Sequence, residues 1–280
     1  MSGDAIHVTR KQPEAVFSLL SSELRIEILR ALSEVRDTPQ TFSDLRARVG
    51  ERDSGKFNYH LGKLEGTFVR RTEDGYELTI AGHQVVGALI AGTYTADAEL
   101  SEVTTDDPCP QCESAALSVS YESEHVKFEC HNCDDFTSTF WFPGGTLDQY
   151  DPDELPAVFD RWMYTLFQQI TAGFCVNCAG RLTGELEPER EPPTISWTCN
   201  LCGDVSRAGI VMPLLFHPAA QGFLVDHGID VSTTPTWQVL TPQTLTQEAD
   251  ETGATVTISI DGDELTGHID TDGRVSSVEW

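Results

Sequence analysis

The eight cysteines of this 280-residue chain all occur in C-x-x-C pairs, a pattern typical of metal binding. The first two pairs are spaced as C-x2-C-x17-C-x2-C and the last two as C-x2-C-x20-C-x2-C, which matches four-cysteine zinc sites. A two-residue gap lets one tight turn aim two thiolates at an ion, and two such turns complete a tetrahedron. The predicted ligands are Cys109, Cys112, Cys130 and Cys133 at the first site, and Cys175, Cys178, Cys199 and Cys202 at the second.

Four thiolates per site predict one structural zinc ion at each, because a catalytic zinc keeps one coordination position open. Rubredoxin-type iron uses the same ligands and is the alternative metal. Disulfides are disfavoured, since nothing in the sequence suggests secretion and cytosolic thiols stay mostly reduced. A redox-active C-x-x-C motif is also possible, but it would not need four C-x-x-C pairs arranged in two spaced sets. His125 and His131 lie near the first site in sequence. We expect neither to be a ligand, because four thiolates complete the coordination shell.

Each C-x-x-C turn is called a knuckle below. Strand-like alternation beside the knuckles favours sequential pairing over a cross-brace, in which the first knuckle would join the third. The predicted strands are 116–121, 126–129, 139–142, 194–198 and 209–212. Each unit then resembles a zinc ribbon, with boundaries at 106–145 and 174–216.

The segments outside the ribbons have patterns of their own. Residues 95–108 are predicted to be a polar connector. Residues 151–173 carry an aromatic and aliphatic stripe at helical spacing, which predicts a helix over 154–172, capped by Asp151 or Asp153, that packs the two ribbons together. Residues 217–280 are predicted to form a short helix and an antiparallel β meander. These elements are the helix 218–227, ended by Gly228, and the strands 255–260, 264–269 and 275–280, with turns at 261–263 and 272–273.

In residues 1–95 the apolar residues recur with a helical period, in contrast to the two-residue period of the strands around the cysteines. Ser22, Thr41 and either Asp53 or Ser54 are candidate N-caps, and Gly50 is a candidate C-terminal residue of a helix. The dipeptide Asp74-Gly75 between two β-like runs predicts a hairpin. The order of these elements predicts a helix-turn-helix followed by a β wing. The predicted helices are 13–20, 23–33, 41–49, 55–65 and 81–94, and the strands of the hairpin are 69–72 and 76–79.

Two segments of this region resemble the ArsR-type winged-helix regulators. Residues 17–32 contain the pattern L-x-x-x-x-R-x-x-I-L, and residues 54–64 are similar to the recognition helix of that family. The resemblance covers about residues 13–94, and the layout of the whole chain is similar to haloarchaeal ArsR-like regulators with C-terminal zinc ribbons. It implies a transcription regulator that binds duplex DNA as a homodimer, paired through the first and last helices of the domain. Metal-sensing members carry cysteines in the helix before the recognition helix. Residues 41–49 contain none, so that role is not implied.

The predicted recognition helix has two unlike faces. Phe57, Leu61 and Leu64 share one face, which we expect to pack on the core, while the opposite face is polar. Such a helix fits the major groove, and its N-terminus offers free N–H groups to a phosphate. Residues 40–71 hold seven Lys and Arg against four Asp and Glu, a net charge of +3. The predicted DNA contacts are Ser54, Lys56, Asn58, Tyr59 and Lys63 in the helix, and Arg70 and Arg71 in the wing.

The acidic residues are distributed unevenly along the chain. Its net charge is −27, but residues 1–95 carry 12 Lys and Arg against 13 Asp and Glu, which leaves −26 on residues 96–280. The acids are interleaved with apolar residues, which favours a halophilic protein over an acidic disordered tail. No run of 18 apolar residues and no secretory signal occurs, so we expect a cytoplasmic protein without a membrane span.

The sequence therefore predicts a multidomain α+β protein: an N-terminal winged helix-turn-helix, two zinc-ribbon-like β units joined by a helix, and a C-terminal antiparallel β meander. No phosphate-binding loop, G-x-S-x-G or H-E-x-x-H motif occurs, so an enzyme is unsupported. A DNA-binding regulator with an unidentified effector is the first hypothesis. A protein-interaction adaptor, whose winged helix binds protein, is the alternative. The apolar face of the helix 81–94 would form a dimer, cover the core of its own domain or contact the ribbons. Its residues are Val85, Val86, Leu89 and Ile90.

Overall fold

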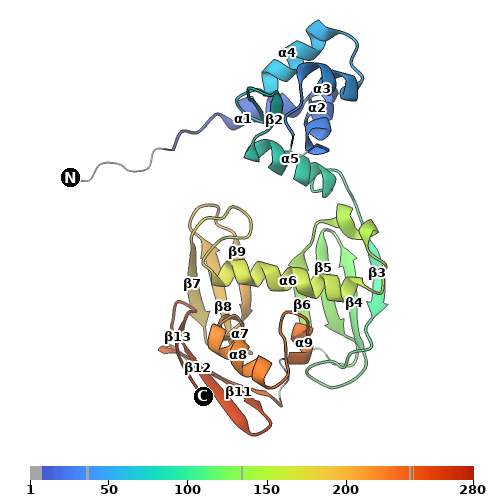
Figure 1. The fold of residues 1–280 in the computed structure, drawn as a ribbon. Coiled ribbons are helices and arrows are strands. Elements are labelled where there is room, and N and C mark those ends of the chain that lie inside the picture. The colour runs from blue at the N-terminus through green and yellow to red at the C-terminus, as the bar shows by residue number, and fades with distance from the viewer. Residues whose placement is uncertain (1–7, 36–37, 134, 240, 242) are drawn as a thin grey trace, which may run out of the picture. The chain divides into compact units, whose positions relative to one another are not determined.

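The computed structural model describes residues 8–35, 38–133, 135–239, 241 and 243–280. The chain divides into two compact units, Met1–Ala96 with Gly144–Thr146, and Asp97–Pro143 with Leu147–Trp280 (Figure 1). Helices accompany antiparallel sheets in both units, so the fold is mixed α and β. Within the described part of the chain, no helix combines the length and apolar character that a membrane crossing requires.

The first unit is mainly helical and ends in a two-stranded hairpin and a last helix. Its hairpin turns at residues 72–75, and β1 pairs with β2 from Val69 opposite Leu78 to Arg71 opposite Tyr76. The predicted turn at Asp74-Gly75 is thereby confirmed. The elements are α1 (Pro13–Phe17), a 3-10 turn (Ser18–Leu20), α2 (Glu23–Ser33), α3 (Phe42–Val49), α4 (Ser54–Leu64), β1 (Val69–Arg71), β2 (Tyr76–Leu78) and α5 (Ile80–Ile90).

Local hydrogen bonds explain where these helices begin and end. The Thr41 hydroxyl accepts from the Asp44 N–H at the start of α3, and Gly50 ends that helix with a left-handed φ of 76°. The predicted cap at Ser22 was only half right. Ser22 does precede α2, but its hydroxyl makes no cap bond and instead lies 3.4 Å from Nδ1 of His60. Helix α5 ends at Ile90, four residues before the predicted end, because the left-handed Gly92 (φ 69°) breaks it.

One hydrophobic core holds the first unit together. Helices α2, α3 and α4 each bury fully enclosed side chains in it, including Ile28, Leu45 and Phe57. Burying a side chain of this size contributes roughly 1.5–3 kcal/mol relative to leaving it exposed. The predicted buried face of α4 is confirmed, because its Phe57, Leu61 and Leu64 are at most 1% exposed. This packing fixes the opposite face of α4 toward solvent.

The second unit contains three antiparallel sheets. Two have four strands, in the orders β3-β4-β5-β6 and β10-β11-β12-β13, and the third has the order β7-β8-β9. The strands are β3 (Leu100–Thr104), β4 (Leu117–Glu122), β5 (His125–Cys130), β6 (Thr137–Trp141), β7 (Leu182–Glu187), β8 (Thr194–Cys199), β9 (Val205–Gly209), β10 (Leu245–Asp250), β11 (Gly253–Ile260), β12 (Asp263–Ile269) and β13 (Val275–Glu279). The helices are α6 (Leu155–Thr171), α7 (Val211–Leu215), α8 (Pro218–Asp226), α9 (Thr236–Val239) and a 3-10 turn (Gly144–Gln149) that the division into units splits.

Several predictions for this unit were wrong in detail. The expected strand 209–212 ends at Gly209, and residues 211–215 form the buried helix α7. An apolar run of this length does not distinguish a buried helix from a strand. The expected connector 95–108 contributes β3, which pairs with β4 as a sheet edge. The meander is confirmed, with β10 as an additional strand at its edge.

Helix α6 contributes to both cores of the second unit. Leu155 and Phe159 join the cluster around β4 and β5, while Tyr164 and Ile170 join the cluster around β7, β8 and the meander. The prediction that this helix packs the two cysteine-bearing units is therefore confirmed. Its N-cap is Glu154, not Asp151 or Asp153, and no side chain caps it. The buried Asp160 holds α9 in place, because its Oδ1 accepts from the N–H and the hydroxyl of Thr236.

Two glycines of α5 provide a matched test of this packing. A Cβ at Gly82 would lie 2.2 Å from the Phe68 carbonyl oxygen, whereas one at Gly87 would meet nothing within 4 Å. We expect Gly82→Ala to destabilise the first unit by about 1–3 kcal/mol through overpacking. Gly87→Ala should stabilise it by roughly 0.5–1 kcal/mol, because alanine is the better helix former. Denaturant unfolding of the two variants measures both effects. Equal effects would contradict the close approach of α5 to Phe68.

Candidate metal centres and nucleic-acid interface

The eight cysteines gather into two groups of four. Cys109, Cys112, Cys130 and Cys133 form one group, and Cys175, Cys178, Cys199 and Cys202 form the other; within each, the Sγ atoms lie within 4.8 Å of one another. The sequential pairing of knuckles is thus confirmed and the cross-brace is excluded. In each group one knuckle precedes the first strand of a hairpin and the other begins at the end of its second strand, namely β4 and β5, or β7 and β8. Antiparallel pairing brings the two knuckles together.

The sulfur positions fit a tetrahedral metal site. In the first group, Sγ of Cys109 is 3.8 Å from that of Cys133, and Cys112 is 3.6 Å from Cys130. The corresponding distances in the second group are 3.7 Å from Cys175 to Cys202 and 3.5 Å from Cys178 to Cys199. Sulfurs about 2.3 Å from a central zinc at tetrahedral corners lie roughly 3.8 Å apart. All eight cysteines are free, so both groups could hold a metal ion and are compatible with zinc.

Each knuckle has the same internal hydrogen bond. The sulfur of its first cysteine accepts, at 3.4 Å, from the backbone N–H two residues later. Such donors stabilise the thiolate over the thiol, and a thiolate is the form that binds metal. The four donors are Gln111, Asn132, Asn177 and Leu201.

The pKa values of the thiols show two opposing effects. Hydrogen bonds from Ser114 lower the pKa of Cys112 to about 6, and backbone N–H groups of Cys202 and Leu201 lower that of Cys199 to about 6. Burial raises the pKa of Cys109 and Cys175. Metal ligation requires all four thiols to ionise, so binding releases protons and weakens as pH falls.

The backbone just after a knuckle is left-handed. Glu113, Ala179 and Gly203 each follow the second cysteine of a knuckle and have φ values of 58°, 57° and 77°. Gly180 is also required, because a Cβ there would lie 2.9 Å from Sγ of Cys199. Neither Gly180 nor Gly203 was predicted from the sequence, although each lies within two residues of the second cysteine of a knuckle. Near the first group, His131 contacts Ser118 and Glu102, and His125 contacts the Ser123 carbonyl, so neither joins the sulfur cluster.

The polar face of α4 is exposed, as predicted. Tyr59 is 61% exposed, and Nζ of Lys63 lies 5.4 Å from the centre of its ring. Arg71 of β1 lies in the same way against Tyr76, 5.7 Å from the ring centre. Among the described residues, no carboxylate forms an ion pair with Lys63 or Arg71. The remaining predicted contacts, Ser54, Lys56, Asn58 and Arg70, are also exposed.

Neighbouring carboxylates engage other cations of this unit. Lys56 pairs with Glu51 at 2.8 Å, Arg70 pairs with Glu77, and Arg48 of α3 pairs with Glu34 at 3.2 Å. The expectation of free N–H groups at the start of α4 was wrong. Oδ1 of Asp53 accepts from the N–H groups of Gly55 and Lys56 at 2.8 and 3.0 Å. A carboxylate therefore occupies the place expected for a phosphate. Among the predicted DNA contacts, Lys63 and Arg71 are the cations left without an ion pair within the described residues.

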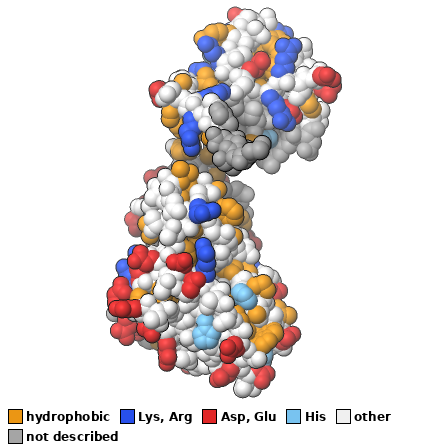
Figure 2. Space-filling view, turned by 90° about the vertical axis from the view of Figure 1, so that its left-hand side faces the viewer, with side chains coloured by type: hydrophobic (Ala, Val, Ile, Leu, Met, Phe, Trp, Pro, Cys, Tyr) orange, Lys and Arg blue, Asp and Glu red, His pale blue; other side chains and the backbone are white. Residues whose placement is uncertain are grey.

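The charge contrast between the two units is visible on the surface. On the face drawn in Figure 2, Lys and Arg side chains are prominent on the helical unit at the top, and Asp and Glu side chains on the unit below. The sequence has the same division, with a net charge of −1 on residues 1–95 and −26 on residues 96–280. The two units therefore differ in surface charge, and the second repels a polyanion more strongly than the first.

The cysteine geometry predicts two metal ions per chain. Elemental analysis of the purified protein should give two equivalents. Cys178→Ser should give one, because its group loses a ligand while the other group keeps all four. Removing both metals with a chelator should unfold the second unit, since structural zinc sites supply roughly 10–16 kcal/mol in model peptides. Fewer than two equivalents in the unsubstituted protein would contradict the two-site prediction, and retention of its circular dichroism without metal would contradict the structural role.

Comparison with known families agrees with the division of the chain. A family model described as a domain of unknown function (DUF7347) matches residues 13–89, which include α1 to most of α5. A second, described as a domain of unknown function (DUF7351), matches residues 106–275, which include both cysteine groups and most of the meander. No curated protein and no solved structure shows significant similarity. The second model covers more than half of the sequence, and the chain therefore belongs to the family described as Domain of unknown function (DUF7351).

Proposed function

We propose that the protein is a DNA-binding transcription regulator of the ArsR-like winged-helix type. The observation that carries this proposal is the exposed face of α4. That helix follows α3 after a four-residue turn, buries its apolar face in the core, and precedes a β hairpin that serves as the wing. Helix-turn-helix proteins place the second of two such helices in the major groove. The resemblance of residues 13–94 to that family supports the same assignment.

The side chains of this face fall into two classes. Lys63, Tyr59 and Asn58 project from α4, and none of them has a carboxylate partner among the described residues, so they are available to phosphates or to base edges. Arg71 of the wing is available to a phosphate in the same way. Lys56 and Arg70 already pair with Glu51 and Glu77, and DNA would have to displace these carboxylates. We therefore assign the larger electrostatic contribution to Lys63 and Arg71.

The two metal centres have a structural role in this proposal. Four sulfur ligands at tetrahedral spacing favour zinc or iron, and we propose zinc. Every coordination position is taken by a cysteine, which leaves none for substrate or activated water. The centres therefore hold the knuckles of each hairpin together. The second unit, held in this way, would respond to an effector or a partner.

We also propose a homodimer, formed through the first and last helices of the DNA-binding domain as the resemblance implies. Phe17 of α1 is 68% exposed, and Ile80 and Ile90 of α5 are 80% and 54% exposed. Apolar side chains of this size gain stability when a partner covers them. A dimer would bind a pseudo-palindromic site with half-sites about one helical turn apart.

The contact face can be tested by fluorescence anisotropy with duplex DNA. Lys63→Ala and Arg71→Ala should each weaken binding and lower the slope of log K against log salt by about 1, because each removes one phosphate contact. Arg48→Ala is the matched control. It removes the same charge from the same unit, but from a residue that already pairs with Glu34, so its effect on the slope should be smaller.

Two results would contradict this assignment. Unchanged affinity of the Lys63 and Arg71 variants at matched salt would refute the contact face. Absence of any affinity for duplex DNA, together with co-purification of transcription machinery, would favour a protein-interaction adaptor in which the same helix binds protein. The net charge of −26 on residues 96–280, which repels DNA, is the observation that favours this second function.

A further inference from the structure

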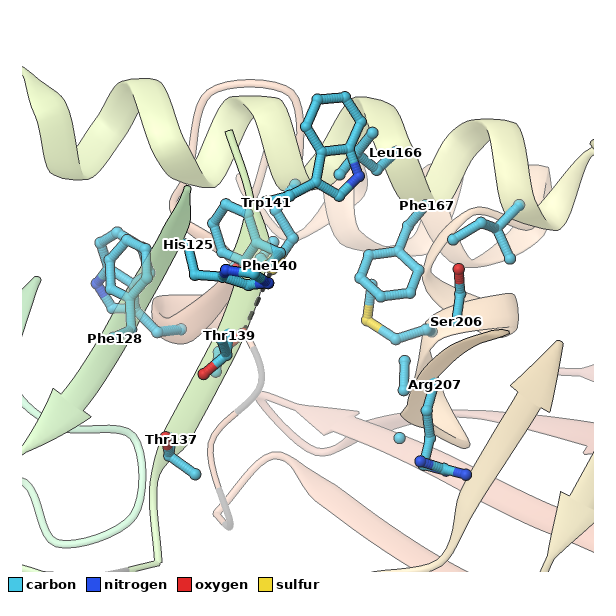
Figure 3. A pocket seen from close by; sticks show the side chains of 18 of the residues that line it. His125, Phe128, Thr137, Thr139, Phe140, Trp141, Leu166, Phe167, Ser206 and Arg207 are labelled. Carbon is cyan, nitrogen blue, oxygen red and sulfur yellow. Dashed lines mark hydrogen bonds between the residues drawn. The ribbon is translucent and has the colours of Figure 1, made fainter. Parts of the chain in front are cut away.

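A cavity of about 550 Å³ lies in the second unit, between α6 and the free edges of two sheets. β6 is the last strand of the sheet beside the first cysteine group, and β9 is the last strand of the sheet beside the second. In Figure 3 the labelled side chains of β6 and β9 lie on opposite sides of the cavity, with α6 above them. A cavity of this size is in the range of small-molecule sites, roughly 300–1,000 Å³.

Aromatic rings make up much of the lining. Phe140 and Trp141 come from β6 and Phe167 from α6, and all three are partly exposed (Figure 3). Trp237 of α9 packs against Phe128 with their ring centres 5.0 Å apart. Aromatic faces carry negative electrostatic potential and attract cations at close range. The cavity therefore combines apolar surface with a preference for positive charge.

The charged groups around the cavity also favour a positively charged ligand. Arg207 is the one lysine or arginine among the described lining residues, and both its Nε and Nη2 donate to the carboxylate of Glu187, at 3.0 and 3.3 Å. Asp204 also lines the cavity; its Oδ2 lies 3.9 Å from Sγ of Cys175, and no ion pair with a cation is found for it among the described residues. Gln111 and Val176, from a knuckle of each cysteine group, line it as well. Four thiolates around a divalent ion leave a net charge of −2 at each group.

The two strand edges add backbone hydrogen-bonding groups. The N–H of Cys130 bonds to the Phe136 carbonyl and that of Phe142 to the Glu124 carbonyl, so even-numbered residues of β6 bond to β5. The N–H and carbonyl groups of the odd-numbered Thr137 and Thr139 then point away from β5, toward the free edge. The bond from the Cys199 N–H to the Asp204 carbonyl gives the same alternation in β9. These edges therefore offer both donors and acceptors to a ligand, and the preference for positive charge comes from the aromatic rings and the acidic surroundings.

We propose that this cavity binds an apolar organic cation that carries aromatic groups. The rings supply contact area and cation–π attraction, while Asp204 and the net charge of −26 on residues 96–280 disfavour anions of the same shape. The site is separate from the DNA-contacting face, and its occupancy can be measured without DNA. Failure of DNA binding would therefore leave this proposal intact, and failure of this proposal would not affect DNA binding.

Two probes of nearly equal shape and opposite charge test the class of ligand. Tetraphenylphosphonium and tetraphenylborate are titrated separately into the full-length, metal-loaded protein by isothermal calorimetry in sodium chloride. We expect the phosphonium to bind at one site per chain and the borate to bind at least about tenfold more weakly. No binding of the phosphonium, or equal or tighter binding of the borate, would overturn the proposal.

A cavity-filling substitution tests the location. Ser206→Trp places an indole in the cavity from β9 and should abolish phosphonium binding. Ser276→Trp, at an exposed position of β13 that does not line this cavity, is the matched control and should bind as the unsubstituted protein does. Far-UV circular dichroism and two metal equivalents establish that each variant is folded. If Ser206→Trp does not fold, Ser138→Trp fills the cavity from β6 instead. Undiminished binding to a folded filled variant would overturn the location.

Discussion

The convergence of four thiolates at each of two points is the constraint on which the second unit depends. Each group joins a knuckle before the first strand of a hairpin to a knuckle at the end of its second strand. The Sγ–Sγ distances between these two knuckles are 3.5–3.8 Å for the pairs Cys109–Cys133, Cys112–Cys130, Cys175–Cys202 and Cys178–Cys199. Four ionised sulfurs at that spacing repel one another unless a cation lies between them. The sheets themselves are small, with three or four strands, so a metal ion bound at each group would, together with α6, supply much of their stability.

The division of charge follows the division of structure. The helical first unit is nearly neutral, and in its described part Lys63 and Arg71 have no carboxylate partner, whereas residues 96–280 carry almost the whole negative charge. A polyanion is therefore repelled far more strongly by the second unit than by the first. The acidic second unit instead favours positively charged ligands, and its cavity has the aromatic lining that such ligands require. The two proposed sites thus differ in the sign of charge that they bind.

Patterns with a strict spacing or period were predicted well from sequence. The C-x-x-C spacing identified both sulfur groups, and the helical stripes located α2, α3, α4 and α6 to within one or two residues. Features that depend on tertiary contacts were not predictable. The apolar residues 211–215 fit a strand as well as a helix, and β3 becomes a strand only by pairing with β4. The cap of Asp53 on Gly55 and Lys56, and the pairing of Lys56 with Glu51, likewise depend on side-chain geometry.

The central claim is that the exposed face of α4 binds DNA in the cell. Chromatin immunoprecipitation of the tagged protein in its native host tests this most directly, because the intracellular salt is then the appropriate one. The parent protein and the Arg48→Ala variant should give discrete peaks, and the double variant Lys63→Ala, Arg71→Ala should lose them at equal abundance. Peaks that persist in the double variant, or no enrichment of the folded parent protein, would contradict the claim.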